Sequence, residues 1–218
     1  MSTRDFLFEI GTEELPPKAL SSLSAALEQN ITAGLQRATL EFDASRRYAT
    51  PRRLAVMVNG LQDQQSDKSI ERLGPAVKAA FDGEGNPTKA ALGFARSCGV
   101  ELADLGRLEK DGVEKLAFSS TEQGRPSTDL LPDIVRAALA QLPIPKQMRW
   151  GSSRIEFVRP VHWAVMILGK ETITTSVLGI ESSNFSFGHR FHYNKAIQID
   201  DAANYEKLLE KTGGIIPD

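Results

Sequence analysis

The chain has 218 residues, of which 41% are hydrophobic and 25% are charged, and its formal net charge is −2. This composition is typical of a globular protein with a sizeable core and argues against a generally basic nucleic-acid binder. The single cysteine, Cys98, excludes an internal disulfide and a cysteine-rich zinc site. The sequence starts without a signal-peptide core and contains no bilayer-length apolar run, which predicts a cytoplasmic protein.

The predicted elements mix helices with short strands and hairpins. Helices are indicated by apolar spacings of three and four, strands by alternation, and one hairpin by Asp111-Gly112. In chain order, the patterns predict a strand at 5–11, a helix from Leu20 through Leu35, a bent strand pair at 45–61, a polar loop at 61–69, turns at 74–87, a helix at 88–99, a hairpin at 105–124, a helix at 127–143, strands within 155–180, a loop or strand edge at 188–194, and a strand followed by a helix at 197–213. This mixture favours an α+β fold with mostly antiparallel sheets, and a subdomain boundary near residue 125 is left open.

No catalytic fingerprint is present, because the phosphate-binding, dinucleotide-binding and nucleophile-elbow motifs are all absent. Glu9, Glu13 and Glu14 would suit a metal or a general base. The favoured alternative is a strand-end glutamate plus two glutamates that compensate the dipole of the following helix. His189 and His192 are expected on opposite faces of an extended segment, without further ligands nearby, so no metal site is predicted.

Arginines gather in segments that also hold aromatic side chains. The stretch 148–169 contains both tryptophans, and alternation over 161–167 predicts a half-buried strand with Trp163 in the core. Arginine suits phosphate and aromatic rings stack on unpaired bases, whereas the ordinary alternative is surface ion pairs around a core tryptophan. The basic groups are Arg46, Arg47, Arg52 and Arg53; Lys146, Arg149, Arg154 and Arg159; and His189 with Arg190.

Six blocks, taken together, resemble the beta subunit of bacterial glycyl-tRNA synthetase. In the family's order they read FLFEIGTEELPPKAL from residue 6, TPRRLAV at 50–56, GPAVKAAFDGEGNPTKAALGFAR at 74–96, LPIPKQMRWG at 142–151, FVRPVHW at 157–163 and GHRF at 188–191. The resemblance implies the N-terminal region of a longer subunit, truncated before its HD-like and anticodon-binding regions. The abrupt GGIIPD ending agrees with that expectation.

The resemblance also implies a heterotetramer of two alpha and two beta subunits, in which the alpha subunit joins glycine to tRNA using ATP and magnesium. This chain is then expected to hold no cofactor, metal or catalytic residue. Its expected partners are the alpha subunit, a second beta subunit and glycine tRNA, without a membrane, and its expected roles are tRNA positioning and subunit assembly. The alternatives are a scaffold that never touches RNA, or an editing-type hydrolytic domain using Glu9 with His189. Candidate tRNA or subunit contacts are Arg52, Arg53, Lys146, Arg149, Trp150, Arg159, His162, His189 and Arg190.

Overall fold

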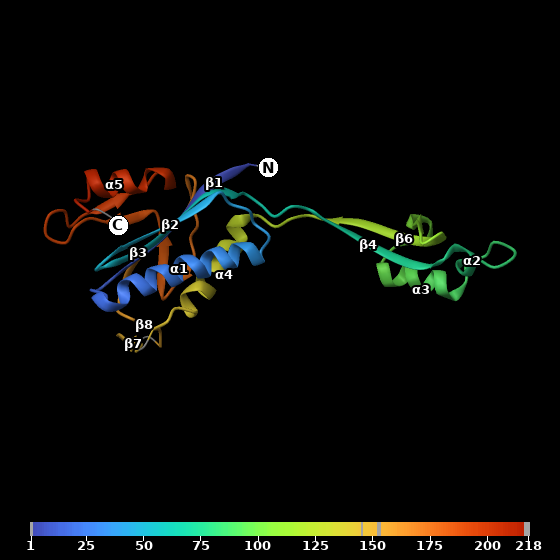
Figure 1. Ribbon diagram of the computed structural model, residues 1–218, viewed down its shortest axis with the longest axis horizontal. Coiled ribbons are helices and arrows are strands. Elements are labelled where there is room, and N and C mark those ends of the chain that lie inside the picture. Colours follow the sequence, from blue (N-terminus) through green and yellow to red (C-terminus); the bar gives the residue numbers. More distant parts are fainter. Residues whose placement is uncertain (1, 145, 152–153, 216–218) are drawn as a thin grey trace. The chain divides into compact units, whose positions relative to one another are not determined.

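The computed structural model describes residues 2–144, 146–151 and 154–215. The chain forms two compact units: unit 1 comprises Met1–Gln65 with Arg125–Asp218, and unit 2 comprises Ser66–Gly124. The chain therefore leaves unit 1 and returns to it, so unit 2 is an insertion (Figure 1). Helices and mostly antiparallel sheets make up the structure, which confirms the predicted α+β class. Within the described ranges, no helix is long and apolar enough to cross a membrane.

Unit 1 is built on one twisted sheet. Its pairs are antiparallel except that of β12 (Ile180–Ser183) with β9 (Val161–Leu168). The order across the sheet is β11 (Ser176–Val177), β12, β9, β1 (Thr3–Thr12), β3 (Arg53–Gln62) and β2 (Ala44–Thr50), and β10 (Glu171–Thr172) also pairs with β9. The remaining elements are α1 (Pro17–Arg37), α4 (Ser127–Ala140), β7 (Met148–Arg149), β8 (Glu156–Phe157), β13 (Phe185–Phe187), β14 (Ala196–Gln198), a short 3-10 helix (Ala202–Asn204) and α5 (Tyr205–Lys211).

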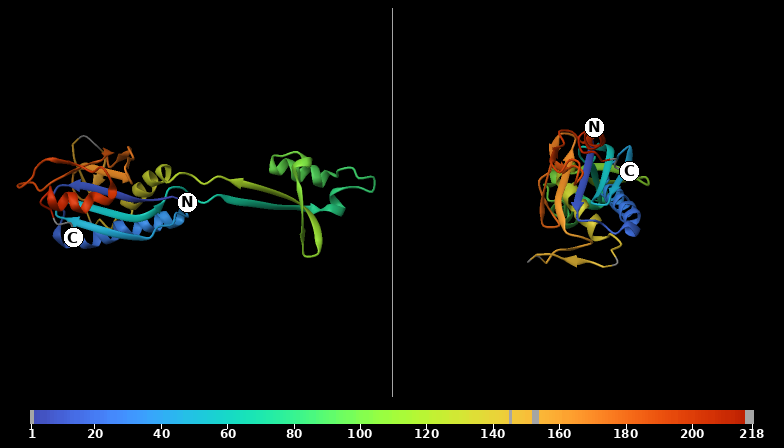
Figure 2. Two further views of the ribbon diagram at one scale, coloured as in Figure 1. Left: turned by 90° about the horizontal axis from the view of Figure 1, so that it is seen from above. Right: turned by 90° about the vertical axis from the view of Figure 1, so that its left-hand side faces the viewer.

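Helices cover both faces of this sheet, with α1 and α4 on one side and α5 on the other (Figures 1 and 2). The strands at its centre are accordingly apolar on both faces, which the period-two alternation of a strand allows. In β1, Phe6 and Phe8 enter the core beneath α1, whereas Leu7 enters the core beneath α5. The half-buried strand predicted at 161–167 is therefore wrong: β9 buries Met166 on one face and Val165 on the other.

Local sequence patterns predict the elements that flank the sheet with mixed success. The helix expected from Leu20 to Leu35 is α1, which buries Leu23, Leu27 and Ile31 completely. The polar loop expected over 61–69 is confirmed for residues 63–67, whereas its two ends belong to strands, because β3 continues to Gln62 and the next strand begins at Lys68. The strand expected over 172–180 is replaced by two strands of two residues each, β10 and β11.

Unit 2 is a small sheet with two helices and a modest core. The core contains Ala80, Ala91 and Leu116. The predicted hairpin is confirmed, and positive φ angles of 55° at Asp111 and 73° at Gly112 suit its two-residue turn. The elements are β4 (Lys68–Ala76), α2 (Val77–Ala80), α3 (Lys89–Cys98), a 3-10 helix (Leu102–Asp104), β5 (Gly106–Lys110) and β6 (Val113–Glu122), with sheet order β4-β6-β5.

Candidate functional site

Four segments that are distant in sequence meet at one end of the unit 1 sheet. Antiparallel pairing places the start of β3 and the start of β9 beside the end of β1, so that Gly11 pairs with Arg53 on one side and with Trp163 on the other. The loop after β13 joins them, because Arg53 Nη2 donates a hydrogen bond to the carbonyl of Phe187. We call this region the sheet end, formed by residues 11–16, 50–53, 158–163 and 186–194.

Backbone hydrogen bonds hold these segments together beyond the strands. The amide of Glu13 donates to the carbonyl of Pro160 at 3.0 Å, and the amide of Leu15 donates to the carbonyl of Pro51 at 2.6 Å. The segment before α1 is thus clamped between the turn of β2–β3 and the approach to β9. Four of the six family-like blocks contribute to this one region.

A buried polar network around Glu9 anchors the sheet end. Glu9 is fully buried and accepts hydrogen bonds from Trp163 Nε1 at 2.5 Å, from Ser186 Oγ at 2.6 Å and from Tyr205 OH at 2.5 Å. Arg53 is 2% exposed and its Nε lies 3.0 Å from Glu9 Oε2. Burial, with the charge of Glu9, raises the pKa of Tyr205 well above its usual range, so the phenol stays a neutral donor.

The network revises two expectations. Glu9 is an internal anchor instead of a simple strand-end glutamate, and both of its oxygens are engaged, which leaves none free to activate a water beside His189. Arg53 is buried with it, whereas its place in a basic group favours a surface position. Among the described residues, no group of three or more His, Cys, Asp or Glu side chains is placed to hold a metal.

Gly11 allows the indole of Trp163 to lie against the backbone of β1. A Cβ at this position would stand 1.9 Å from Trp163 Cε2, closer than any real contact. We expect Gly11→Ala to displace the ring from its bond to Glu9 and to lower the free energy of unfolding by about 1–3 kcal/mol, as overpacking does. Urea unfolding followed by tryptophan fluorescence measures both effects, because both tryptophans lie in unit 1. An unchanged emission spectrum would contradict this packing.

Exposed charges lie on the solvent side of the same segments. His162 Nε2 lies 2.9 Å from Glu13 Oε1, and Arg52 Nη2 lies 3.7 Å from the same oxygen. Glu13 and Glu14 precede α1 as expected but lie outside its first turn, and Glu13 also pairs sideways with His162 of β9. Arg159 Nε donates to the carbonyl of Glu14 at 3.0 Å. Arg52, His162 and Arg159 therefore surround the entry to α1.

The stretch 142–151 lies beside this group. Arg149 Nε forms an ion pair with Glu156 Oε1 at 2.5 Å, and Trp150 packs against the core beneath α1. Lys146 and Arg159 line a cavity of about 570 Å³ together with Lys18. Positions 145, 152 and 153 of this stretch lie outside the described residues.

The loop after β13 turns tightly over residues 190–192. His189 Nδ1 accepts hydrogen bonds from the amides of Phe191 at 3.2 Å and His192 at 3.3 Å. The two histidine rings lie 4.5 Å apart, so the predicted extended segment with opposed histidines is wrong. Phe191 is 84% exposed, with Arg190 Cζ 5.9 Å from its ring centre. The turn thus presents an aromatic ring and a guanidinium to solvent.

A cavity of about 340 Å³ opens between this turn and the start of β3. Its walls carry four basic side chains and two aromatic rings against one carboxylate. We call it the Trp163 cavity, and its lining residues are Glu14, Thr50, Pro51, Arg52, Arg53, Trp163, Gly188, His189, Arg190, Phe191, Gly214 and Ile215.

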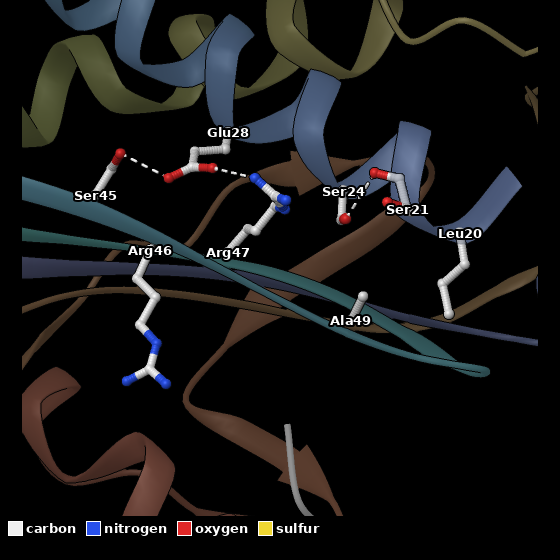
Figure 3. A pocket seen from close by; sticks show the side chains of 8 residues that line it. All are labelled: Leu20, Ser21, Ser24, Glu28, Ser45, Arg46, Arg47 and Ala49. Atoms are coloured by element: carbon white, nitrogen blue, oxygen red, sulfur yellow. Dashed lines mark hydrogen bonds and ion pairs between the residues drawn. The ribbon is translucent and has the colours of Figure 1, made fainter. Parts of the chain in front are cut away.

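The basic group at 46–53 does not form one patch. Strand alternation turns Arg47 toward α1, where it pairs with Glu28 at 3.3 Å, and Arg46 toward the opposite face, where it pairs with Glu206 at 3.2 Å (Figure 3). Ser45 also donates to Glu28, at 2.8 Å, so two polar side chains in the groove of about 550 Å³ between α1 and β2 are paired with the same carboxylate. Of this group, Arg52 alone reaches the exposed side of the sheet end.

Comparisons with known proteins agree with the family resemblance of the six sequence blocks. A family model described as the glycyl-tRNA synthetase beta subunit matches residues 6–218. The chain is 51% identical to the glycine–tRNA ligase beta subunit of Hahella chejuensis, 48% to that of Marinobacter nauticus and 50% to that of Coxiella burnetii, in each case over 100% of this chain. The chain spans 32% of the length of each of these relatives.

Proposed function

Since the chain belongs to the glycyl-tRNA synthetase beta subunit family, we propose that it supports glycyl-tRNA synthesis by binding and positioning tRNA at the sheet end. In this proposal glycine, ATP and the tRNA 3′ end react on a separate alpha subunit that uses magnesium. This chain contributes no bond-making group, and its share of the rate comes from holding the tRNA in place.

The observation that carries the proposal is the gathering of exposed cations and aromatic rings where four family-like blocks converge. Arg52, Arg190 and Arg159 bring guanidinium groups to this surface, and Phe191 adds an exposed ring. Guanidinium groups match phosphate oxygens, and exposed rings stack on unpaired bases. Because the whole chain carries a net charge of −2, such a local patch is what an RNA contact requires.

Subunit assembly is the second proposed role, and a different surface favours it. The cavity near α1 combines the basic Lys18 and Lys146 with apolar walls that include Pro16, Pro143 and Met148, of which Met148 is 39% exposed. A mixed apolar and basic surface of this kind suits a protein partner more than a bare phosphate chain. We assign it to contact with the alpha subunit or a second beta subunit in a cytoplasmic heterotetramer.

Titrating the chain with glycine tRNA and, in parallel, with the separate alpha subunit tests both roles. We expect tRNA binding to weaken steeply with salt, by about 10-fold or more between 50 and 200 mM, because phosphate contacts release counterions. Binding to the alpha subunit is expected to change much less with salt. Alpha binding without any tRNA binding would make the chain a scaffold and would contradict the tRNA role.

A further inference from the structure

We propose that the Trp163 cavity binds a single unstacked nucleotide of an RNA, with the base against its aromatic rings and the phosphate against its arginines. The identity of that RNA rests on the proposed function, whereas the choice of a nucleotide rests on the cavity itself. At about 340 Å³, the cavity is at the small end of the range for ligand pockets and suits one small ligand.

Phe191 is the first residue that supports a base-binding site. It lines the cavity yet is 84% exposed, and therefore contributes almost nothing to the core. The turn that presents it is fixed by the bonds from the amides of Phe191 and His192 to His189 Nδ1. A large ring held in solvent on a tight turn is a stacking platform for a base.

Trp163 provides a second aromatic wall, and its orientation is fixed. Its Nε1 donates to Glu9, its ring lies over Gly11, and its ring centre is 5.0 Å from that of Phe187. These contacts leave the indole little freedom to rotate. A base entering the cavity therefore meets a rigid surface, and less entropy is lost on binding.

The arginines supply the polar part of the site. Arg53 is almost fully buried, and its Nη1 has no hydrogen-bond partner within the described ranges. A buried charged donor without a partner is costly, and a ligand oxygen would offset that cost. Arg190 adds an exposed guanidinium group to the same wall and Arg52 a half-buried one, which also lies 3.7 Å from Glu13.

This combination favours a nucleotide over other anions. Inorganic phosphate would use the arginines and leave the exposed ring of Phe191 without a role. A duplex keeps its bases stacked inside the helix, so a single-stranded segment or end of the tRNA fits better. The rings and guanidinium groups together require a ligand that has both a flat face and a phosphate.

Fluorescence titration of the full 218-residue chain tests the proposal. In a Trp150→Phe background, Trp163 is the one remaining tryptophan and reports on the cavity directly. We expect saturable changes in its emission with glycine tRNA and, more weakly, with the four nucleoside 5′-monophosphates. Phe191→Ala is expected to weaken tRNA binding about 10-fold, within the range of a base–aromatic stack. The matched control is Phe185→Ala, which removes another exposed phenylalanine, 43% exposed and outside the cavity lining.

The outcomes separate the nucleotide site from the proposed function. Binding of tRNA with equal affinity by Phe191→Ala and the parent, without a change in Trp163 emission, would overturn the nucleotide site and leave tRNA binding intact. Binding of monophosphates but not of tRNA would support the site for free nucleotides and contradict the proposed function. Saturation by inorganic phosphate as tight as that by the monophosphates would show an anion site and overturn the role given to the rings.

Discussion

Replacing Glu9 by glutamine is expected to lower the free energy of unfolding of unit 1 by about 3–5 kcal/mol, the cost of breaking a buried ion pair. The substitution keeps the shape of the side chain but leaves the guanidinium of Arg53 buried without a counter-charge. It also weakens the acceptor of the bonds from Trp163, Ser186 and Tyr205. Because both tryptophans lie in unit 1, urea unfolding followed by tryptophan fluorescence measures the effect on that unit.

Two further variants isolate the ion pair as the cause. Glu13→Gln removes an exposed carboxylate that pairs with His162, and a surface pair contributes only about 0–1 kcal/mol. The double variant Glu9→Gln with Arg53→Met removes both charges and is expected to unfold at higher urea than Glu9→Gln alone, since no unpaired charge remains. A loss with Glu9→Gln no larger than with Glu13→Gln would show that the network is not the anchor of the sheet end.

Reversing two charges at the sheet end is expected to produce the largest loss of tRNA affinity. Arg52→Glu combined with Arg190→Glu should weaken binding at least 10-fold at physiological salt and reduce the salt slope by about two, since each lost phosphate contact removes about one. Arg46→Glu is the matched control. Arg46 is an arginine of unit 1 with a side chain 59% exposed, but it pairs with Glu206 away from the sheet end.

Salt dependence decides the interpretation of this experiment. A loss of binding free energy for Arg46→Glu half as large as that for the double variant would mean that tRNA senses only the overall charge of the chain, because the single reversal changes that charge by half as much. A loss of affinity without any change in slope would point to misfolding, which circular dichroism of the same samples would detect. The predicted result is a loss confined to the double variant, with a shallower slope and an unchanged spectrum.

The sequence predicts elements whose signal is local. β1 and α1 follow from an apolar run and from leucines at helical spacing, and the β5–β6 hairpin follows from Asp111-Gly112, where positive φ angles are required. The α+β class follows from their mixture. These features need no knowledge of distant partners, because periodicity and turn chemistry are properties of adjacent residues.

Features that depend on distant partners could not be predicted. Nothing in the residues around Glu9 indicates that it is buried. Its hydrogen-bond partners Ser186 and Tyr205 are distant in sequence and meet it only in the folded chain. The same tertiary contact buries Arg53, which local charge alone assigns to the surface. The insertion of unit 2 after Gln65 gives no local signal either, since its boundary falls within a short polar segment between two strands.

Some of the residues at the sheet end can be predicted from the sequence. Arg52, His162, His189 and Arg190 were all candidates, and the structure brings them to one end of the sheet. Phe191 was missed as a site residue, although its place directly after Arg190 in a turn was the available signal. The alternation of 161–167 predicts Trp163 in the core, and it does pack there, but its ring also lines the cavity.

Hydrogen exchange of the chain with and without glycine tRNA, at physiological salt, tests most directly whether the sheet end is the tRNA surface. The loop at 188–194 and the turn at 50–53 are expected to exchange more slowly in the complex, while the β5–β6 hairpin of unit 2 exchanges at an unchanged rate. Slower exchange confined to other segments, with the loop and the turn unaffected by bound tRNA, would contradict the assignment of this surface.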